Sequence, residues 1–152
     1  MPTIDTSFYQ PTHTVTGPAY SPWFKLLATV TTIVLMGYGV SVALRFPIMD
    51  YGLGVQLLLL SAAVLLGLSY YGFLHSTVTI DAQGITQTWL INRHVDWRDV
   101  RSAKMIGIPR AGWLFPPRLV VRTGTSYNTF NGGTATLLTE FAKISLAFQM
   151  KK

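Results

Sequence analysis

Two uninterrupted apolar runs determine the architecture of this chain: LLATVTTIVLMGYGVSVAL at residues 26–44 and YGLGVQLLLLSAAVLLGLSYYGFL at residues 51–74. Neither run contains a charged residue, and only residues 45–50 separate them. As helices the runs would measure roughly 28 Å and 36 Å, and a bilayer's hydrocarbon core is about 30 Å thick. The pattern predicts a two-helix transmembrane hairpin over residues 23–75. A soluble pair of buried helices is the alternative, but such long uncharged neighbours are rare in small soluble domains.

The composition limits what the rest of the chain can be. The 152 residues suffice for one small domain beside the hairpin. Charged residues make up only 12% of the chain, against roughly 25% in a typical soluble domain. The chain has no cysteine, which excludes disulfides, thiolate metal sites and cysteine nucleophiles.

The positive charge belongs to the C-terminal half. Residues 75–152 hold ten of the twelve Lys and Arg residues but four of the six acids, so this half alone carries the whole net charge of +6. A basic domain tethered to a bilayer is drawn to anionic headgroups. An ordinary solvated surface with a modest excess of cations is the alternative.

Residues 1–22 are rich in Thr and Pro and lack the basic start and cleavage pattern of a secretory signal. We expect a retained, mostly irregular tail. Amphipathic aromatic residues are favoured at headgroup level. Four aromatic residues of the tail and the first helical turn are candidates for that position: Tyr9, Tyr20, Trp23 and Phe24.

Small residues recur along both apolar runs. Gly37 and Ser41 in the first run, and Ala63 and Gly67 in the second, have the four-residue spacing that permits close approach of helix backbones. We favour packing of the two helices on each other over packing on an external partner. No ionisable residue lies inside either run, so a proton relay or ion pathway has no carrier.

From Ser76 onward the pattern changes to short alternating stretches rich in β-branched residues. Six strands are expected, at residues 77–81, 85–91, 94–97, 102–108, 118–123 and 127–130. A helix capped by Thr134 should then close the domain. Its apolar positions are Leu137, Phe141, Ile144 and Phe148, and its outward positions are Thr136, Glu140 and Lys143.

The segments TVTIDAQGIT (77–86) and HVDWRDV (94–100), after a membrane hairpin and before an amphipathic helix, resemble bacterial pleckstrin-homology-like (YcxB-like) membrane proteins. Ile80-Asp81, Gly84-Ile85 and the Trp97–Val100 stretch carry the likeness, which covers about residues 25–150. It implies an α+β domain at residues 76–152, a PH-like antiparallel β-roll of seven strands capped by a helix. The seventh strand would be merged with the second apolar helix or lie within residues 111–117.

The resemblance also implies scaffolding, assembly or regulation at the bacterial inner membrane. Two crossings place both termini on one side. Lys25 and Arg45 balance at the two ends of the first run, so residue counting alone does not orient the hairpin. The basic domain, the missing signal peptide and the resemblance favour cytoplasmic termini.

A basic set and an unusual loop are the candidate binding residues. The basic set comprises Arg93, Arg98, Arg101, Lys104, Arg110, Arg118 and Arg122, which would contact anionic phospholipid or merely face water. The segment RAGWLFPPR (110–118), which we call the Trp113 loop, has three large apolar residues between arginines: Trp113, Leu114 and Phe115. The loop is expected either to dip into the membrane interface or meet a partner, or to fold back with Trp113 in the core.

No catalytic or metal-binding arrangement stands out. Trp89 and Trp97 are expected in the core, and the carboxylates of Asp81, Asp96 and Asp99 in turns and caps. His13, His75 and His94 lack metal-ligand spacing. A hydrolase set of His94, Asp96 and Ser102 has no supporting context, and the glycine turns lack the phosphate-loop pattern.

We therefore expect a non-enzymatic inner-membrane accessory or scaffold protein without cofactor or metal. Its partners would be the bilayer and another protein, or a second copy, docked on the hairpin. The alternative is a sensor of anionic lipid that uses the basic strands and the Trp113 loop, and an enzyme ranks third. Nucleic acid is not expected, because neither a recognition helix nor an aromatic platform is evident.

Overall fold

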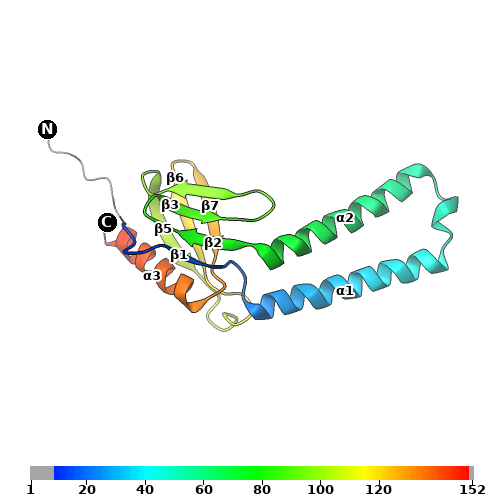
Figure 1. The fold of residues 1–152 in the computed structure, drawn as a ribbon, viewed down its shortest axis with the longest axis horizontal. Coiled ribbons are helices and arrows are strands. Elements are labelled where there is room, and N and C mark those ends of the chain that lie inside the picture. Colours follow the sequence, from blue (N-terminus) through cyan, green and yellow to red (C-terminus); the bar gives the residue numbers. More distant parts are fainter. Residues whose placement is uncertain (1–8, 151–152) are drawn as a thin grey trace.

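The computed structural model of the chain describes residues 9–150. A β domain lies at one end, and a long helical hairpin projects from it (Figure 1). The elements are, in order, β1 (Val15–Pro18), α1 (Pro22–Arg45), the 3-10 helix η1 (Ile48–Asp50), α2 (Leu53–His75), β2 (Thr77–Ile80), β3 (Gly84–Gln87), β4 (Arg93–Asp96), β5 (Val100–Ile106), β6 (Arg118–Thr123), β7 (Ser126–Asn131) and α3 (Ala135–Gln149).

The two expected apolar helices are present and slightly longer than their uncharged cores. Ser21 caps α1 by accepting a hydrogen bond from the Phe24 amide at 3.2 Å, and Pro22 occupies the first turn, where its missing N–H costs nothing. Pro47 disfavours helix at the residue before it, and α1 ends at Arg45. Each helix is long and apolar enough to span a membrane.

The hairpin is inserted into a sheet. β1 pairs antiparallel with β2, with Val15 opposite Ile80 and Pro18 opposite Thr77, although the whole hairpin separates them in sequence. The prediction of an irregular tail is wrong for residues 15–18, and the seventh strand lies there, not in residues 111–117 or in α2. Residues 1–8 of the tail lie outside the described residues.

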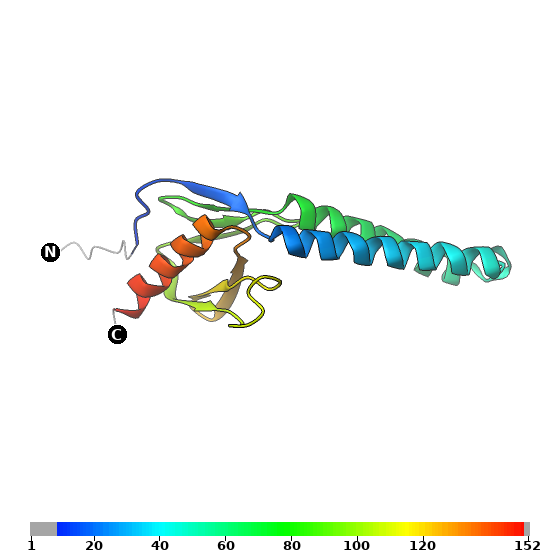
Figure 2. The same cartoon turned by 90° about the horizontal axis from the view of Figure 1, so that it is seen from below.

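Seven antiparallel strands form two sheets, in the orders β1-β2-β3-β4 and β5-β6-β7. Figure 2 shows the sheets as two layers, with α3 closing one side between them, where it packs on β1, β5 and β6. The large apolar side chains that are fully buried come from both sheets and from α3: Val78, Ile80, Ile85, Leu119, Val121, Phe130, Leu137, Phe141 and Ile144. Two antiparallel sheets with a helix packed against them confirm an α+β domain.

One strand is much shorter than predicted. β3 ends at Gln87, so residues 88–92 form the loop to β4. Trp97 is buried as expected, with 3% of its surface exposed. Trp89, also expected in the core, is instead 36% exposed in the loop.

Helix α3 has the predicted apolar face and one misassigned residue. Thr134 caps it, accepting a hydrogen bond from the Leu137 amide at 3.5 Å. Glu140, predicted to face away, is only 6% exposed. Its carboxylate accepts hydrogen bonds from the Tyr9 hydroxyl at 2.5 Å and from the Lys143 ammonium at 2.7 Å. Charge pairing with Lys143 therefore permits burial that the helical pattern alone did not indicate.

The carboxylate of Glu140 should make the β domain sensitive to acid. Burial raises its pKa, but the hydrogen bonds from Lys143 and Tyr9 outweigh burial and lower the pKa overall. A carboxyl with a lowered folded-state pKa stabilises the fold above its unfolded pKa, and this contribution is lost as pH falls through the folded value. We expect Glu140→Gln to reduce the free energy of unfolding at pH 7 by about 1–3 kcal/mol. It should also weaken the pH dependence between about pH 5 and 3, measured by urea unfolding.

Tyr9→Phe is the matched control for this prediction. It deletes one hydrogen bond to Glu140 and keeps the ring, which packs edge-on against Trp97 at 5.1 Å between centroids. We expect Tyr9→Phe to reduce the free energy of unfolding at pH 7 by about 1 kcal/mol, which is less than the effect of Glu140→Gln. An unchanged acid profile in Glu140→Gln would show that this carboxylate does not govern acid stability.

Candidate functional site at the helix-proximal end of the β domain

The two ends of the β domain differ in chemistry. We call the end from which α1 and α2 depart the helix-proximal end; it comprises residues 19–21, 76–77, 88–93, 107–118 and 131–134 (Figure 1). The opposite, distal end comprises the turns at 81–83, 97–99 and 124–125. Backbone contacts join the two sheets at the helix-proximal end, where the Gly133 amide donates to the Pro18 carbonyl at 2.9 Å.

Short connections fix the hairpin to the sheet. Three residues join β1 to α1, and only Ser76 joins α2 to β2. The Ala19 amide donates to the Ser76 carbonyl at 3.0 Å, which extends the β1–β2 ladder toward the helices. The Lys25 ammonium donates to the Leu74 carbonyl at 2.9 Å and thus ties the first turn of α1 to the last turn of α2. The helices and the sheet therefore form one continuous unit.

An aromatic cluster fills the junction. Tyr20 stacks on Phe24 at 4.9 Å between centroids, and both rings meet Phe73 edge-on, at 5.2 and 5.5 Å. Trp89 extends the cluster, with its ring 6.1 Å from that of Phe73. Gly72 makes this contact possible, because a Cβ there would lie 2.1 Å from the indole nitrogen of Trp89. The β3–β4 loop (residues 88–92) thus rests on the last turn of α2.

The Trp113 loop is exposed and lies at the start of α1. Trp113 is 63% exposed, and its ring meets that of Trp23 edge-on at 6.2 Å. Of the two alternatives for this loop, burial of Trp113 in the core is therefore wrong. Hydrogen bonds from the Leu114 and Phe115 amides to the Ala111 carbonyl hold the turn.

The basic set divides between the two ends. Arg93, Arg110 and Arg118 belong to the helix-proximal end, whereas Arg98, Arg101 and Arg122 belong to the distal end, and Lys104 lies mid-strand in β5. Burial raises the pKa of Tyr20, and the positive charges of Arg118 and Arg93 act in the opposite direction. Both guanidinium groups therefore lie near the junction.

Acidic residues are concentrated away from the helix-proximal end. Within residues 9–150, Asp81, Asp96 and Asp99 lie at or beside the distal turns, and Glu140 pairs with Lys143. Asp50 lies at the far tip of the hairpin. Consequently, no arginine of the helix-proximal end forms an ion pair within the described residues.

The distal end offers a shallow polar depression of about 420 Å³, lined by Arg98, Asp99, Arg101, Thr123 and Gly124. Arg122 lies beside it but is engaged elsewhere: its guanidinium lies over the Tyr127 ring at 5.7 Å, and its Nε donates to the Gly124 carbonyl at 3.3 Å. The distal cations thus lie beside an acid and a polar turn, unlike their helix-proximal counterparts.

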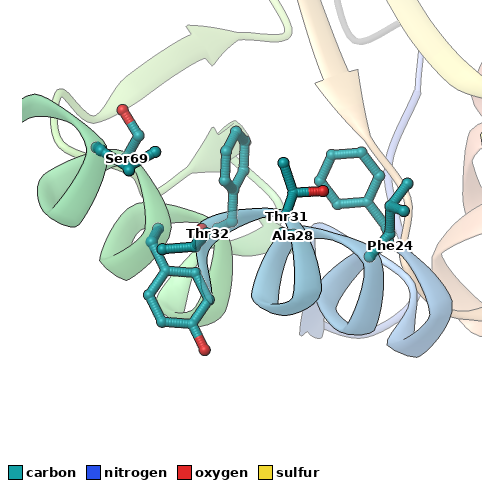
Figure 3. Close-up of a pocket in the computed structure, with 9 residues that line it drawn as sticks. Phe24, Ala28, Thr31, Thr32 and Ser69 are labelled. Carbon is teal, nitrogen blue, oxygen red and sulfur yellow. The ribbon is translucent and has the colours of Figure 1, made fainter. Parts of the chain in front are cut away.

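A crevice of about 220 Å³ opens between the helices close to the junction (Figure 3). Nine residues line it: Phe24, Leu27, Ala28, Thr31, Thr32, Leu66, Ser69, Tyr70 and Phe73. Beside it, the hydroxyls of Thr29 and Tyr70 share a hydrogen bond of 3.0 Å that links the helices. The crevice wall is almost wholly apolar.

The small residues of the hairpin do not join its two helices. A Cβ added at Gly37 or Gly67 would meet nothing within 4 Å, and Ala63 is exposed. The Ser41 hydroxyl donates to the Gly37 carbonyl of its own helix at 2.9 Å. The expected packing of α1 on α2 through these positions is therefore not found, and the small-residue faces are open.

The groups considered for catalysis are dispersed or structural. Asp81 Oδ1 accepts hydrogen bonds from the Gln83 and Gly84 amides, so its role in the turn is confirmed. His94 contacts Asp96 at 3.2 Å on the exposed face of β4, whereas Ser102 lies on β5 in the other sheet. Within residues 9–150, no group of three or more His, Asp or Glu could hold a metal ion.

Comparisons of the chain with protein-family models, with curated proteins and with solved structures gave no match.

Sequence reasoning identified the Trp113 loop, three arginines of the helix-proximal end and the aromatic residues at the start of α1, but it missed the β3–β4 loop. Leu90 and Ile91, assigned to a strand, are 47% and 78% exposed in the β3–β4 loop. In the sequence, Lys25 is informative only about the orientation of the hairpin, whereas in the structure its ammonium binds the Leu74 carbonyl. The available clue was the run Trp89-Leu-Ile91 directly before the polar pair Asn92-Arg93, which is typical of an apolar loop tip.

Proposed function

We propose that this chain is a non-enzymatic accessory protein of the bacterial inner membrane, with its hairpin in the bilayer and its β domain and both termini in the cytoplasm. The exposure of the hairpin carries the proposal. The most apolar 18 residues of α1 and of α2 have mean hydropathies of 1.8 and 2.0. Only 0% and 6% of these residues are buried within the chain. Buried helices of a soluble protein would be covered by the chain, so exposed apolar helices of this length favour a lipid environment.

The β domain supports a PH-like roll as the presented module. Sheets of four and three antiparallel strands with a C-terminal helix match the architecture that the resemblance implies. The position of the hairpin departs from that pattern, because β1 precedes it. Such a module presents a surface at the membrane and performs no reaction there.

The hairpin is the proposed docking element for another membrane helix, first of all from a second copy. The support is the open faces at Gly37, Ala63 and Gly67, which the chain itself leaves uncovered. Small residues favour helix association in lipid because they let backbones approach closely.

The purified full-length chain should therefore form dimers or larger complexes in mild detergent, measured by light scattering after size-exclusion chromatography. Gly67→Leu should weaken the association by about tenfold in dissociation constant, because the larger side chain separates the backbones. Gly54→Leu is the matched control, since it makes the same change at another open position of α2. A monomer with no bound protein would refute the docking role.

A further inference from the structure

The helix-proximal end carries exposed apolar groups where the helices begin and end. Leu90 and Ile91 are at the tip of the β3–β4 loop, and Trp113 and Ile108 in the β5–β6 loop are 63% and 58% exposed. Trp113 touches the second residue of α1, Trp23, which is itself 59% exposed. Two loops that are distant in sequence thus place apolar side chains beside the helix ends, the β3–β4 loop beside the end of α2 and the Trp113 loop beside the start of α1.

Helix length places these groups at interface depth. With 24 and 23 residues, α1 and α2 measure roughly 36 Å and 35 Å, against about 30 Å of hydrocarbon. The first turn of α1 and the last turn of α2 therefore reach the headgroup region if the hairpin spans the bilayer. Tryptophan is enriched at this depth because its ring is apolar and its N–H is polar.

The charge of the same end matches an anionic surface. Arg93, Arg110 and Arg118 belong to it, and Lys25 lies in the first turn of α1. The acids of the described residues are elsewhere, at the distal turns, on α3 and at the hairpin tip. Cations beside apolar residues are the combination that binds anionic lipid surfaces.

The rigid junction keeps this end against the bilayer. Ser76 is the sole residue between α2 and β2, and its hydroxyl donates to the Thr88 carbonyl, which anchors the β3–β4 loop beside the helix end. The short connection therefore holds the β domain beside the bilayer, where the attraction of its cations to the headgroups sets how deeply the loop tip enters. Lipid, and not water, would then cover the exposed tip of the loop.

We propose that the helix-proximal end is a contact site for anionic phospholipid, seated on the headgroups of the bilayer that holds the hairpin. Leu90, Ile91 and Trp113 enter the interface. Arg93, Arg110 and Arg118 bind lipid phosphates around them. This inference rests on the proposed membrane position of the hairpin and adds a ligand to it.

The absence of cysteine permits a direct depth measurement on the full-length chain. Single cysteines would be introduced by Ile91→Cys at the loop tip, Val64→Cys in the middle of α2 and Ala82→Cys at the distal turn, and each labelled with a fluorophore. The variants are reconstituted in vesicles of phosphatidylcholine, alone or with 30% phosphatidylglycerol, that contain a lipid-borne quencher. Quenching at Ile91→Cys should be at least twofold stronger with phosphatidylglycerol and should fall at high salt. Quenching at Ala82→Cys should be absent.

Matched charge variants identify the cations. Each cation near an anionic surface contributes about fivefold to adsorption, so R93Q/R110Q/R118Q should remove most of the phosphatidylglycerol-dependent quenching at Ile91→Cys. R98Q/R101Q/R122Q removes the same amount of charge from the distal end and should leave the phosphatidylglycerol-dependent quenching unchanged.

The label at Val64→Cys separates the two proposals. If it is not quenched, the hairpin is not in the bilayer, and the proposed function fails. If it is quenched while Ile91→Cys is not, the lipid site is refuted and the hairpin assignment stands. Loss of quenching at Ile91→Cys as the protein-to-lipid ratio rises would mean that a second copy covers the loop, which also refutes the lipid site.

Discussion

Val15→Asp is expected to unfold the β domain, with a loss of at least about 4 kcal/mol in its free energy of unfolding. Val15 is 6% exposed and lies opposite Ile80 in the β1–β2 ladder, so the carboxylate would enter the core without a partner. An unpaired buried charge costs about 3–5 kcal/mol, to which the lost burial of the valine side chain adds about 1.5 kcal/mol. Because the free energy of unfolding of a small domain is about 5–15 kcal/mol in total, most of the stability would be lost. Urea unfolding in detergent, followed by circular dichroism, measures the change.

Thr16→Asp is the control on the same strand. Thr16 is exposed on the opposite face, where its hydroxyl meets that of Thr79 at 3.1 Å. Thr16→Asp introduces the same charge into β1 but leaves the core intact, so the free energy of unfolding should fall by less than about 1 kcal/mol. Equal effects of the two substitutions would mean that the strand does not contribute to the core, and that residues 15–18 are the irregular tail that the sequence suggested.

The sequence was informative where structure is local. Two long apolar runs suffice to predict α1 and α2, because helix length and hydropathy are properties of consecutive residues. The apolar face of α3 follows in the same way from Leu137, Phe141 and Ile144. β1 could not be found by such reasoning: Val15-Thr-Gly-Pro18 has one large apolar residue and two strand breakers, and its partner lies beyond the hairpin.

The sequence predicted which residues could form the candidate site, but not which of them lie together in space. Arg93 and Arg98 are five positions apart but lie at opposite ends of the domain, because β4 runs between them. Arg93 and Arg118 belong to different sheets, yet both act on Tyr20. Grouping of charges thus depends on strand direction, which alternates in an antiparallel sheet and cannot be read from spacing in the chain.

The insertion of the hairpin changes what can be separated experimentally. A fragment that begins at His75 lacks β1, which covers one edge of the first sheet and packs on α3. Such a fragment would expose the edge of β2 and part of the core, so binding by the fragment would not represent the β domain of the full-length chain. Measurements on the β domain therefore require the hairpin.

Gly133→Ala should destabilise the junction between the helices and the β domain by about 2–4 kcal/mol. A Cβ at Gly133 would lie 2.4 Å from the Pro18 carbonyl oxygen and 2.5 Å from that of Tyr20. Both atoms belong to the backbone, so the clash cannot be relieved by rotating a side chain. The β1–α1 connection must move away, and the hydrogen bond from the Gly133 amide to the Pro18 carbonyl would break.

The comparison with Gly112→Ala tests this steric cause. Gly112 lies in the Trp113 loop with nothing within 4 Å of its Cβ position, so the same substitution should change stability by less than about 0.5 kcal/mol. Hydrogen exchange of the Ala19 amide gives a local measurement, because that amide donates to the Ser76 carbonyl across the junction. Faster exchange in Gly133→Ala than in Gly112→Ala is expected. Equal exchange in the two variants would show that the junction accommodates the methyl group, and that the contact of Gly133 with β1 does not hold the hairpin in place.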